Sequence, residues 1–195
     1  MSNRAQRIHH VRAYMLHASA WRETSLIVQI FTREHGNVAM AAKGAKRPYS
    51  ALRPVLAAFQ PLMVSWTGAG EVKTLTRADL AGIRQLTGRS LMSAWYMNEL
   101  LLRLLPREDP HPLLYDAYDA ALHALEQGES AAGALRRFEW TLLEETGYGM
   151  GGDIPQFDLP AEEKRLRAIL RSRLDDLLGR PLRTRQVMQE LQRYS

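Results

Sequence analysis

The chain has 195 residues, of which 46% are hydrophobic and none is cysteine. This length allows one large globular domain or two small ones, and the absence of cysteine excludes disulfides, thiolate zinc sites and cysteine nucleophiles. The sequence has no uncharged apolar run of about 18 residues, and its start, MSNRAQRIHHVR, lacks the apolar block of a secretory signal. We therefore expect a cytoplasmic protein without a membrane partner.

Charge is distributed unevenly along the chain. Residues 1–80 hold 11 basic and 4 acidic side chains, residues 81–159 hold 6 and 12, and residues 160–195 hold 9 and 5. A basic N-terminal part beside an acidic middle indicates a polyanionic partner for the first part, with chance segregation as the alternative.

Residues 7–76 predict about five short strands. Apolar side chains recur at every second position in Val11–Met15, Leu26–Ile30 and Val38–Ala42. Two further runs, PLMVSW and EVKTL, flank the glycine-bearing loop Gly68–Gly70 and predict a hairpin. Five strands in so few residues favour a small barrel of the OB type, with an SH3-like barrel as the alternative.

After Leu80 the apolar period lengthens to about 3.6 residues, which predicts an all-helical domain over residues 81–195 after a nucleic-acid-binding domain over residues 1–80. The expected fold class is therefore α+β. Apolar spacing and helix start and stop signals predict helices over 90–105, 112–127, from near Ser130 to Thr146, over 160–179 and over 183–193. Trp95 is expected on the apolar side of the first of these helices. Residues 147–159, GYGMGGDIPQFDL, predict a loop because four glycines and a proline interrupt any period.

Three cations, a glycine and a tyrosine follow the third predicted strand in AAKGAKRPYS, residues 41–50. An OB barrel binds nucleic acid in a groove across its second and third strands, where cations contact phosphates and aromatic rings stack on bases. The predicted DNA-contacting cations are Lys43, Lys46, Arg47, Arg53, Lys73 and Arg77. The predicted stacking residues are Tyr49, Trp21 and Trp66. A solvated loop is the alternative interpretation for the cations, and the barrel core is the alternative for the aromatic rings.

Sequence signatures of enzymes are absent. TGAGEVKT lacks the spacing G-x-x-x-x-G-K-[ST] of a phosphate-binding loop, and neither G-x-S-x-G nor H-E-x-x-H occurs. The six histidines are scattered without metal-ligand spacing. We therefore expect no catalytic residue, no metal and no cofactor, and a protein that is not an enzyme.

A pair of arginines precedes two aromatic residues in one predicted helix. Arg136 and Arg137 are followed by Phe138 and Trp140. Such a combination can receive an acidic peptide with an aromatic side chain, because arginine binds carboxylates and an apolar groove takes a ring. The alternative is a helix whose apolar side is core and whose arginines are solvated.

Several motifs occur in the order and spacing of one protein family. WRETSLIVQIFTREHGNVAMAAKGAKRPYSALRPVLAAFQPLMVSW, followed by GAGEVKTL, resembles the N-terminal domain of the bacterial recombination mediator family RecO. YMNELLLRLLP, LLYDAYDAAL and ALRRFEWTLLEETGYG resemble the helical domain of that family. The resemblance covers residues 8–150 and resumes in GRPLRTRQVMQEL near the end of the sequence.

The resemblance implies an N-terminal OB fold, a helical C-terminal domain and a function in the RecFOR pathway of DNA recombination and repair. Members of the family bind single- and double-stranded DNA and anneal complementary strands, including strands coated by single-stranded DNA-binding protein. They cooperate with RecR, and often RecF, to load RecA, without nucleotide hydrolysis. The helical domain of the family also receives the acidic C-terminal tail of the single-stranded DNA-binding protein. Arg136 is then the strongest candidate for a tail contact, with Arg137 and Trp140 beside it, and the implied location is the cytoplasm, in association with the nucleoid.

Two features depart from the family pattern. Many relatives carry a four-cysteine zinc site after the GYG motif, and they have a longer segment there. This chain has no cysteine and passes from GYGMGGD to DLPAEEKRL within a few residues, so we expect no metal and a natural contraction of residues 147–159.

Three other interpretations stay open. The first is an OB-fold protein that binds RNA, and the second is an adaptor that binds proteins through its helices. The third is a nuclease or nucleotide hydrolase, for which the sequence lacks the clustered carboxylates of a two-metal site.

Overall fold

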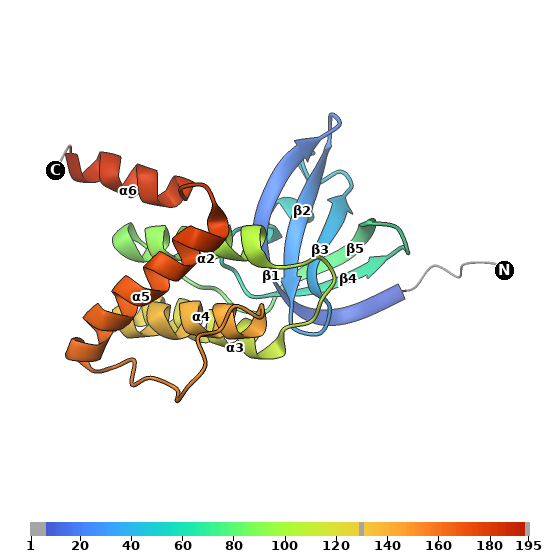
Figure 1. Ribbon diagram of the computed structural model, residues 1–195. Coiled ribbons are helices and arrows are strands. Elements are labelled where there is room, and N and C mark those ends of the chain that lie inside the picture. Colours follow the sequence, from blue (N-terminus) through green and yellow to red (C-terminus); the bar gives the residue numbers. More distant parts are fainter. Residues whose placement is uncertain (1–6, 129–130, 194–195) are drawn as a thin grey trace. The chain divides into compact units, whose positions relative to one another are not determined.

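The computed structural model describes residues 7–128 and 131–193. Contacts within the chain define two compact units, one of residues up to Arg84 together with Pro106–Pro112, the other of Gln85–Leu105 and the residues from Leu113 onward. Figure 1 shows that the first unit is built of strands and the second of helices. The predicted α+β class is therefore confirmed.

The first unit is a closed barrel of five strands within the described part of the chain. The strands lie in the order β1-β2-β3-β5-β4, and all neighbours are antiparallel except β3 and β5. Their bounds are β1 (Arg7–Trp21), β2 (Ser25–Thr32), β3 (Gly36–Ala42), β4 (Leu62–Thr67) and β5 (Val72–Leu80). The small closed barrel confirms the predicted OB fold.

Alternating side chains of these strands fill the barrel core, as the period of two requires. Val28, Ile30, Met40 and Val64 are completely buried. The last strand continues to Leu80, beyond the predicted limit of residue 76. A four-residue helix, α1 (Leu52–Val55), follows β3 and was not predicted from the pattern.

The segment Pro106–Pro112 belongs to the barrel unit although helical sequence flanks it on both sides. The backbone N–H of Glu108 donates a hydrogen bond to the carbonyl of Asn37 (3.0 Å) at the start of β3. Gly36 has a φ of +65°, and a side chain there would overlap the backbone of Asp109. The close approach of this segment therefore requires glycine at position 36.

The second unit contains helices α2 (Gly88–Leu104), α3 (Pro112–Gln127), α4 (Ala131–Glu145), α5 (Pro160–Leu178) and α6 (Arg183–Arg193). They confirm the predicted helices to within about two residues at the ends, except that the predicted start near Ser130 lies outside the described residues. Residues 147–159 form the predicted loop. Helix α4 packs on α5, and α2 packs on α6.

The prediction for Trp95 is wrong, because its side chain is 38% exposed. The buried side of α2 runs instead through Ala94, Met97 and Leu101, at spacings of three and four residues. Helix α5 begins with Pro160, as the sequence predicts, and ends at Gly179, whose φ of +61° is the left-handed conformation of a helix C-cap.

None of the helices in the described ranges is both long enough and apolar enough to cross a membrane.

Candidate nucleic-acid interface

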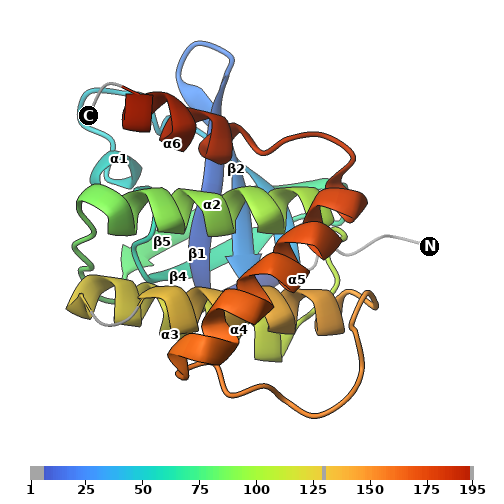
Figure 2. The same cartoon turned by 60° about the vertical axis from the view of Figure 1, so that its left-hand side comes forward.

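Two neighbouring loops of the barrel carry most of the predicted contact residues. Residues 22–24 connect β1 to β2, and residues 43–51 connect β3 to α1. The backbone N–H of Lys46 donates to the carbonyl of Thr24 (2.9 Å), and the N–H of Gly44 donates to Oγ of Ser25 (3.4 Å). Ala45 is 2% exposed and anchors the second loop in the barrel core. These contacts hold the two loops side by side, and Figure 2 shows the β1–β2 hairpin projecting from the barrel.

The structure brings Lys43, Lys46 and Arg47 together on the second loop, with all three side chains exposed. Two hydrogen-bonded turns connect this loop to α1. Ser50 donates its backbone N–H to the carbonyl of Arg47 (3.1 Å), and Arg53 donates its backbone N–H to the carbonyl of Ser50 (3.2 Å). Arg53 lies on the exposed side of α1. The arrangement presents four cations from one short segment to solvent.

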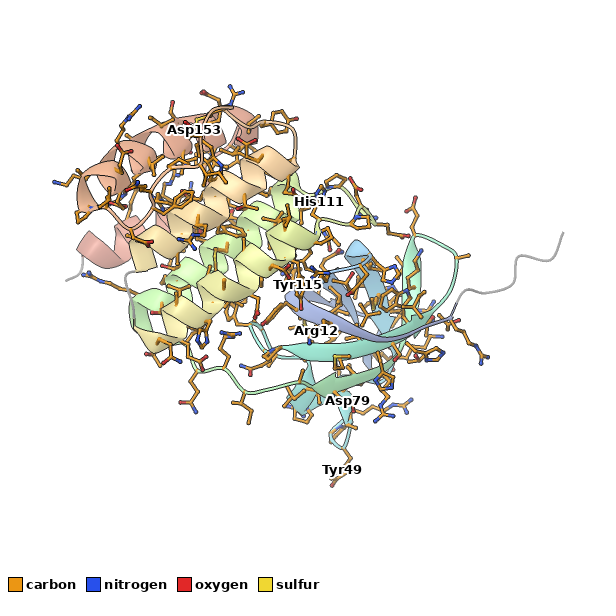
Figure 3. The ribbon with its side chains drawn as sticks, turned by 90° about the horizontal axis from the view of Figure 1, so that it is seen from below. Arg12, Tyr49, Asp79, His111, Tyr115 and Asp153 are labelled. Carbon is orange, nitrogen blue, oxygen red and sulfur yellow. The ribbon has the colours of Figure 1, made fainter. Side chains whose placement is uncertain are left out.

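Aromatic side chains lie beside these cations. Tyr49 is 101% exposed, and Figure 3 shows it pointing away from the barrel. Trp21 is half-buried, and the guanidinium of Arg22 lies 4.2 Å from the centroid of its ring. Arg22 has a φ of +55°, which is uncommon for a residue other than glycine. Sequence reasoning missed Arg22, although its position in a tight turn after Trp21 was a usable signal.

Trp66 is not available for stacking on a base. Its side chain is 3% exposed in the barrel core, and its ring packs edge-on against His35 at a centroid distance of 5.1 Å. The interpretation of Trp66 as a stacking residue is therefore corrected to the alternative given above, a core residue.

Lys73 and Arg77 have other electrostatic partners. Nζ of Lys73 lies 2.8 Å from the carboxylate of Glu108 and 2.8 Å from the carbonyl of Gly70, and the residue is 8% exposed. Arg77 is exposed on β5 and its Nε lies 2.6 Å from Asp79. The hydrogen bond that Arg77 donates to Asp79, together with the negative charge of this carboxylate, raises the pKa of Arg77 above the ordinary value. Both cations are therefore paired with carboxylates of the barrel unit.

The predicted peptide-binding residues of α4 line two different hollows of the helical unit. Arg136 is 8% exposed and its Nη2 lies 2.8 Å from Glu139, at the wall of a hollow of about 330 Å³. Arg137 and Trp140 line a second hollow of about 600 Å³, formed with residues 154–159. Arg137 is exposed there, and its guanidinium lies 5.4 Å from the ring centroid of Phe157.

Glu139 is the buried centre of the first hollow. It accepts hydrogen bonds from the hydroxyl of Tyr96 (2.8 Å) and from Arg136 (2.8 Å). Burial raises the pKa of Glu139 above its ordinary value, and the positive charge of Arg136, which alone would lower this pKa, only partly offsets the effect. Burial, together with the charge of Glu139, raises the pKa of Tyr96 well above its ordinary value. Three further arginines, Arg167, Arg171 and Arg185, complete the rim, so the hollow favours an anionic group.

No group of three or more histidine, aspartate or glutamate side chains in the described ranges could hold a metal ion.

Comparison with known proteins decides the family. The model of the N-terminal domain of recombination protein O matches residues 6–84, and the model of its C-terminal domain matches residues 85–151. The chain belongs to the RecO family. The two loops of residues 22–24 and 43–51 lie within the first matched range, whereas α5 and α6 lie beyond the second.

Curated relatives agree with this assignment. The DNA repair protein RecO of Aromatoleum aromaticum is 58% identical over 150 residues, which cover 76% of this chain and 62% of the relative. The DNA repair protein RecO of Cupriavidus metallidurans is 54% identical over 148 residues, covering 75% of this chain and 50% of the relative. That of an Azoarcus strain is 53% identical over 146 residues, covering 74% and 60%. The matched part thus spans between half and about three-fifths of these relatives.

Proposed function

We propose that this RecO-family chain acts in DNA repair by binding DNA through the two-loop cluster, defined as Trp21, Arg22, Lys43, Lys46, Arg47, Tyr49 and Arg53. The observation that carries the proposal is the pair of hydrogen-bonded loops, which presents exposed cations beside an exposed ring. Cations that contact phosphates give affinity without sequence preference, and rings that stack on unpaired bases favour single strands. Lys73 is left out of the proposed contact set because it is buried against Glu108, and Arg77 is left out because it lies on β5, outside the two loops.

The mechanism follows from this charge arrangement. Neutralising the phosphates of a strand lowers its repulsion toward a complementary strand, and binding raises the local concentration of the strands. Annealing is then accelerated without a covalent step. We further infer, from family membership, that the protein works in the cytoplasm at the nucleoid, acts on strands coated by single-stranded DNA-binding protein, and helps RecR and RecF to load RecA.

Fluorescence anisotropy with a labelled single-stranded oligonucleotide tests the cluster. Five cations that each contact a phosphate should give a slope of log affinity against log salt of about −3.5. The triple variant Lys43→Ala/Lys46→Ala/Arg47→Ala should weaken the slope by about 2 and leave the melting temperature unchanged. A slope near zero for the natural protein would remove the proposal, and tighter binding of matched RNA would redirect it to RNA.

Arg107 supplies a matched control in the same unit. It is 62% exposed and bridges Asn37 at the start of β3, whereas Lys43 follows the far end of that strand. Seven residues of strand separate the two positions by about 20 Å. Arg107→Ala should leave the affinity for DNA nearly unchanged, and an effect as large as that of Lys46→Ala would show that only net charge matters.

We also propose that the helical domain binds the acidic C-terminal tail of single-stranded DNA-binding protein, with Arg136, Arg137 and Trp140 as the contacts. The arginine-rimmed first hollow and the aromatic second hollow both suit such a peptide. Fluorescence anisotropy with a labelled acidic peptide that ends in an aromatic residue would distinguish the two hollows. Weaker peptide binding by Arg136→Ala would indicate the first hollow, and weaker binding by Arg137→Ala would indicate the second. If Arg136→Ala perturbs the fold, Arg171→Ala at the rim of the same hollow replaces it. Unchanged peptide affinity in all variants would overturn the proposal.

A further inference from the structure

A row of cations follows one side of α5, beyond the residues that match the family models. Lys164, Arg167 and Arg171 are exposed and follow one another at spacings of three and four residues, which places them on the same helix side. The small residues Ala168 and Ser172 lie between them. Together with Asp175 these side chains line a shallow groove of about 480 Å³. Figure 2 shows α5 crossing α4, so this helix forms an outer layer of its unit.

The charges of this row are only partly balanced. Asp175 lies 3.9 Å from Arg171 and accepts a hydrogen bond of 2.6 Å from Arg185, so one carboxylate serves two guanidinium groups. Within residues 7–128 and 131–193, no carboxylate forms an ion pair with Lys164 or Arg167. Lys164 therefore keeps its positive charge toward solvent, whereas the charge of Arg167 also acts on the buried Glu139.

Spacing and lining of the groove favour a nucleic-acid backbone. The seven helical steps from Lys164 to Arg171 rise by about 10 Å, the distance over which one strand of a duplex advances by about three nucleotides along the axis, at about 3.4 Å each. The small side chains of Ala168 and Ser172 let a backbone approach the helix. The groove has no aromatic or large apolar side chain to hold a peptide ring or a base, so contacts there would be restricted to phosphates.

We propose that α5 forms a second phosphate-binding surface, the α5 row (Lys164, Arg167, Arg171), which takes the backbone of a second nucleic-acid strand. This inference depends on the proposed function, in which the two-loop cluster binds the first strand. A molecule with one such surface on each unit holds two strands at once and makes their encounter intramolecular. The row thereby adds a strand-bridging activity that the barrel alone does not supply.

Lys164 offers a sharp test, because its neighbour Arg165 provides a matched control. Arg167 and Arg171 also line the hollow around Glu139, whereas Lys164 lines the groove and does not line that hollow. Arg165 lines a hollow on another side of the helix, beside Leu166 and Ile169. Lys164→Glu and Arg165→Glu change the net charge equally and lie on different sides of the helix, and of the two only Arg165→Glu also removes an ion pair, that of Arg165 with Glu162 (3.7 Å).

The experiment uses the full chain and two non-complementary oligonucleotides. One oligonucleotide is immobilised and saturated with protein, and capture of the second, labelled one is measured against salt. We expect Lys164→Glu to reduce capture several-fold and to weaken its salt slope by about 0.7 or more, while Arg165→Glu retains capture. Binding of the first strand should stay unchanged in both variants, and Ser172→Glu should repeat the effect of Lys164→Glu.

Three results would overturn the inference. If Lys164→Glu and Arg165→Glu reduce capture of the second oligonucleotide equally, the effect is one of net charge. If Lys164→Glu captures the second oligonucleotide as well as the natural protein does, the bridging arises elsewhere, for example from a second copy of the chain. Binding of an acidic peptide that is lost in Lys164→Glu, with capture of the second strand unaffected, would assign the groove to a protein partner. Failure of the natural protein to bind even the first strand would instead reject the proposed function.

Discussion

The ion pair between Lys73 and Glu108 distinguishes a structural role of Lys73 from a role in DNA binding. The Lys73 side chain is 10% exposed and that of Glu108 is 44% exposed. Removing one partner of a fully buried pair costs about 3–5 kcal/mol, and removing a surface pair costs at most about 1 kcal/mol. For Glu108→Gln we expect a loss of about 2 kcal/mol, because the Lys73 ammonium stays buried without a countercharge and keeps only the carbonyl of Gly70 as a hydrogen-bond acceptor.

Lys73→Met should be milder, because methionine retains most of the apolar volume and the released Glu108 is hydrated. We expect a loss below about 1 kcal/mol. Native-state hydrogen exchange of the amides of β3 and β5 measures the stability of the barrel unit directly. A loss for Lys73→Met that exceeds the loss for Glu108→Gln would refute this account of the pair.

DNA binding gives the second readout for the same variant. Lys73→Met should leave the salt slope of oligonucleotide binding unchanged, whereas Lys46→Ala should weaken it by about 0.7, the share of one phosphate contact. If Lys73→Met weakens binding as much as Lys46→Ala, the ion pair opens on DNA binding, and the geometric reasoning that removed Lys73 from the interface fails.

Three further variants test the barrel, the buried acid and the exposed ring. Gly36→Ala should lower the free energy of unfolding by about 3 kcal/mol, because alanine is strained in the left-handed conformation and its Cβ would overlap Asp109. Gly128 also has a positive φ, +70°, but open space around it, so Gly128→Ala should lower the free energy of unfolding by only about 1 kcal/mol. Urea unfolding measures both. Burial raises the pKa of Glu139 above its ordinary value of 4.5. The protonated side chain therefore stabilises the fold below pH 4.5, and this contribution is lost as the pH rises through the folded-state pKa. Glutamine cannot ionise, so the melting temperature of Glu139→Gln minus that of the natural protein should increase from pH 4.5 toward neutrality, and a constant difference would contradict the shift. Tyr49→Ala should leave the melting temperature unchanged and reduce affinity for single strands by about 1 kcal/mol or more, with duplex affinity unaffected, as measured by anisotropy.

The sequence predicted the elements well because their signals are local. Alternation with a period of two defines the strands, and proline or glycine at helix ends defines α5 and its loop. The errors arose where the third dimension decides. Trp95 belongs to a helix that is apolar over a wide angle, and only packing selects the buried side. The segment 106–112 gave no sign that it returns to the barrel, because its contacts with β3 are made by backbone atoms.

The site shows the same distinction between local and distant contacts. Lys43, Lys46 and Arg47 are close in sequence, so their common location needs no tertiary information. Lys73 was expected beside them, but it shares strand parity with Leu75, a core residue, and therefore points inward. That parity was readable from the sequence, whereas its partner Glu108, 35 residues away, was not.

Two carboxylates of the acidic middle of the chain, Glu99 and Glu139, are held by partners inside the helical unit. Glu99 accepts hydrogen bonds from the backbone N–H groups of Arg183 (2.8 Å) and Thr184 (2.9 Å), at the start of α6. Burial opposes ionisation of Glu99, but these hydrogen bonds outweigh it and lower its pKa, so the charge is held where it satisfies a helix N-terminus. Glu139 is likewise engaged inside its own unit. Neither of these two carboxylates is therefore available to neutralise the exposed cations of the two-loop cluster.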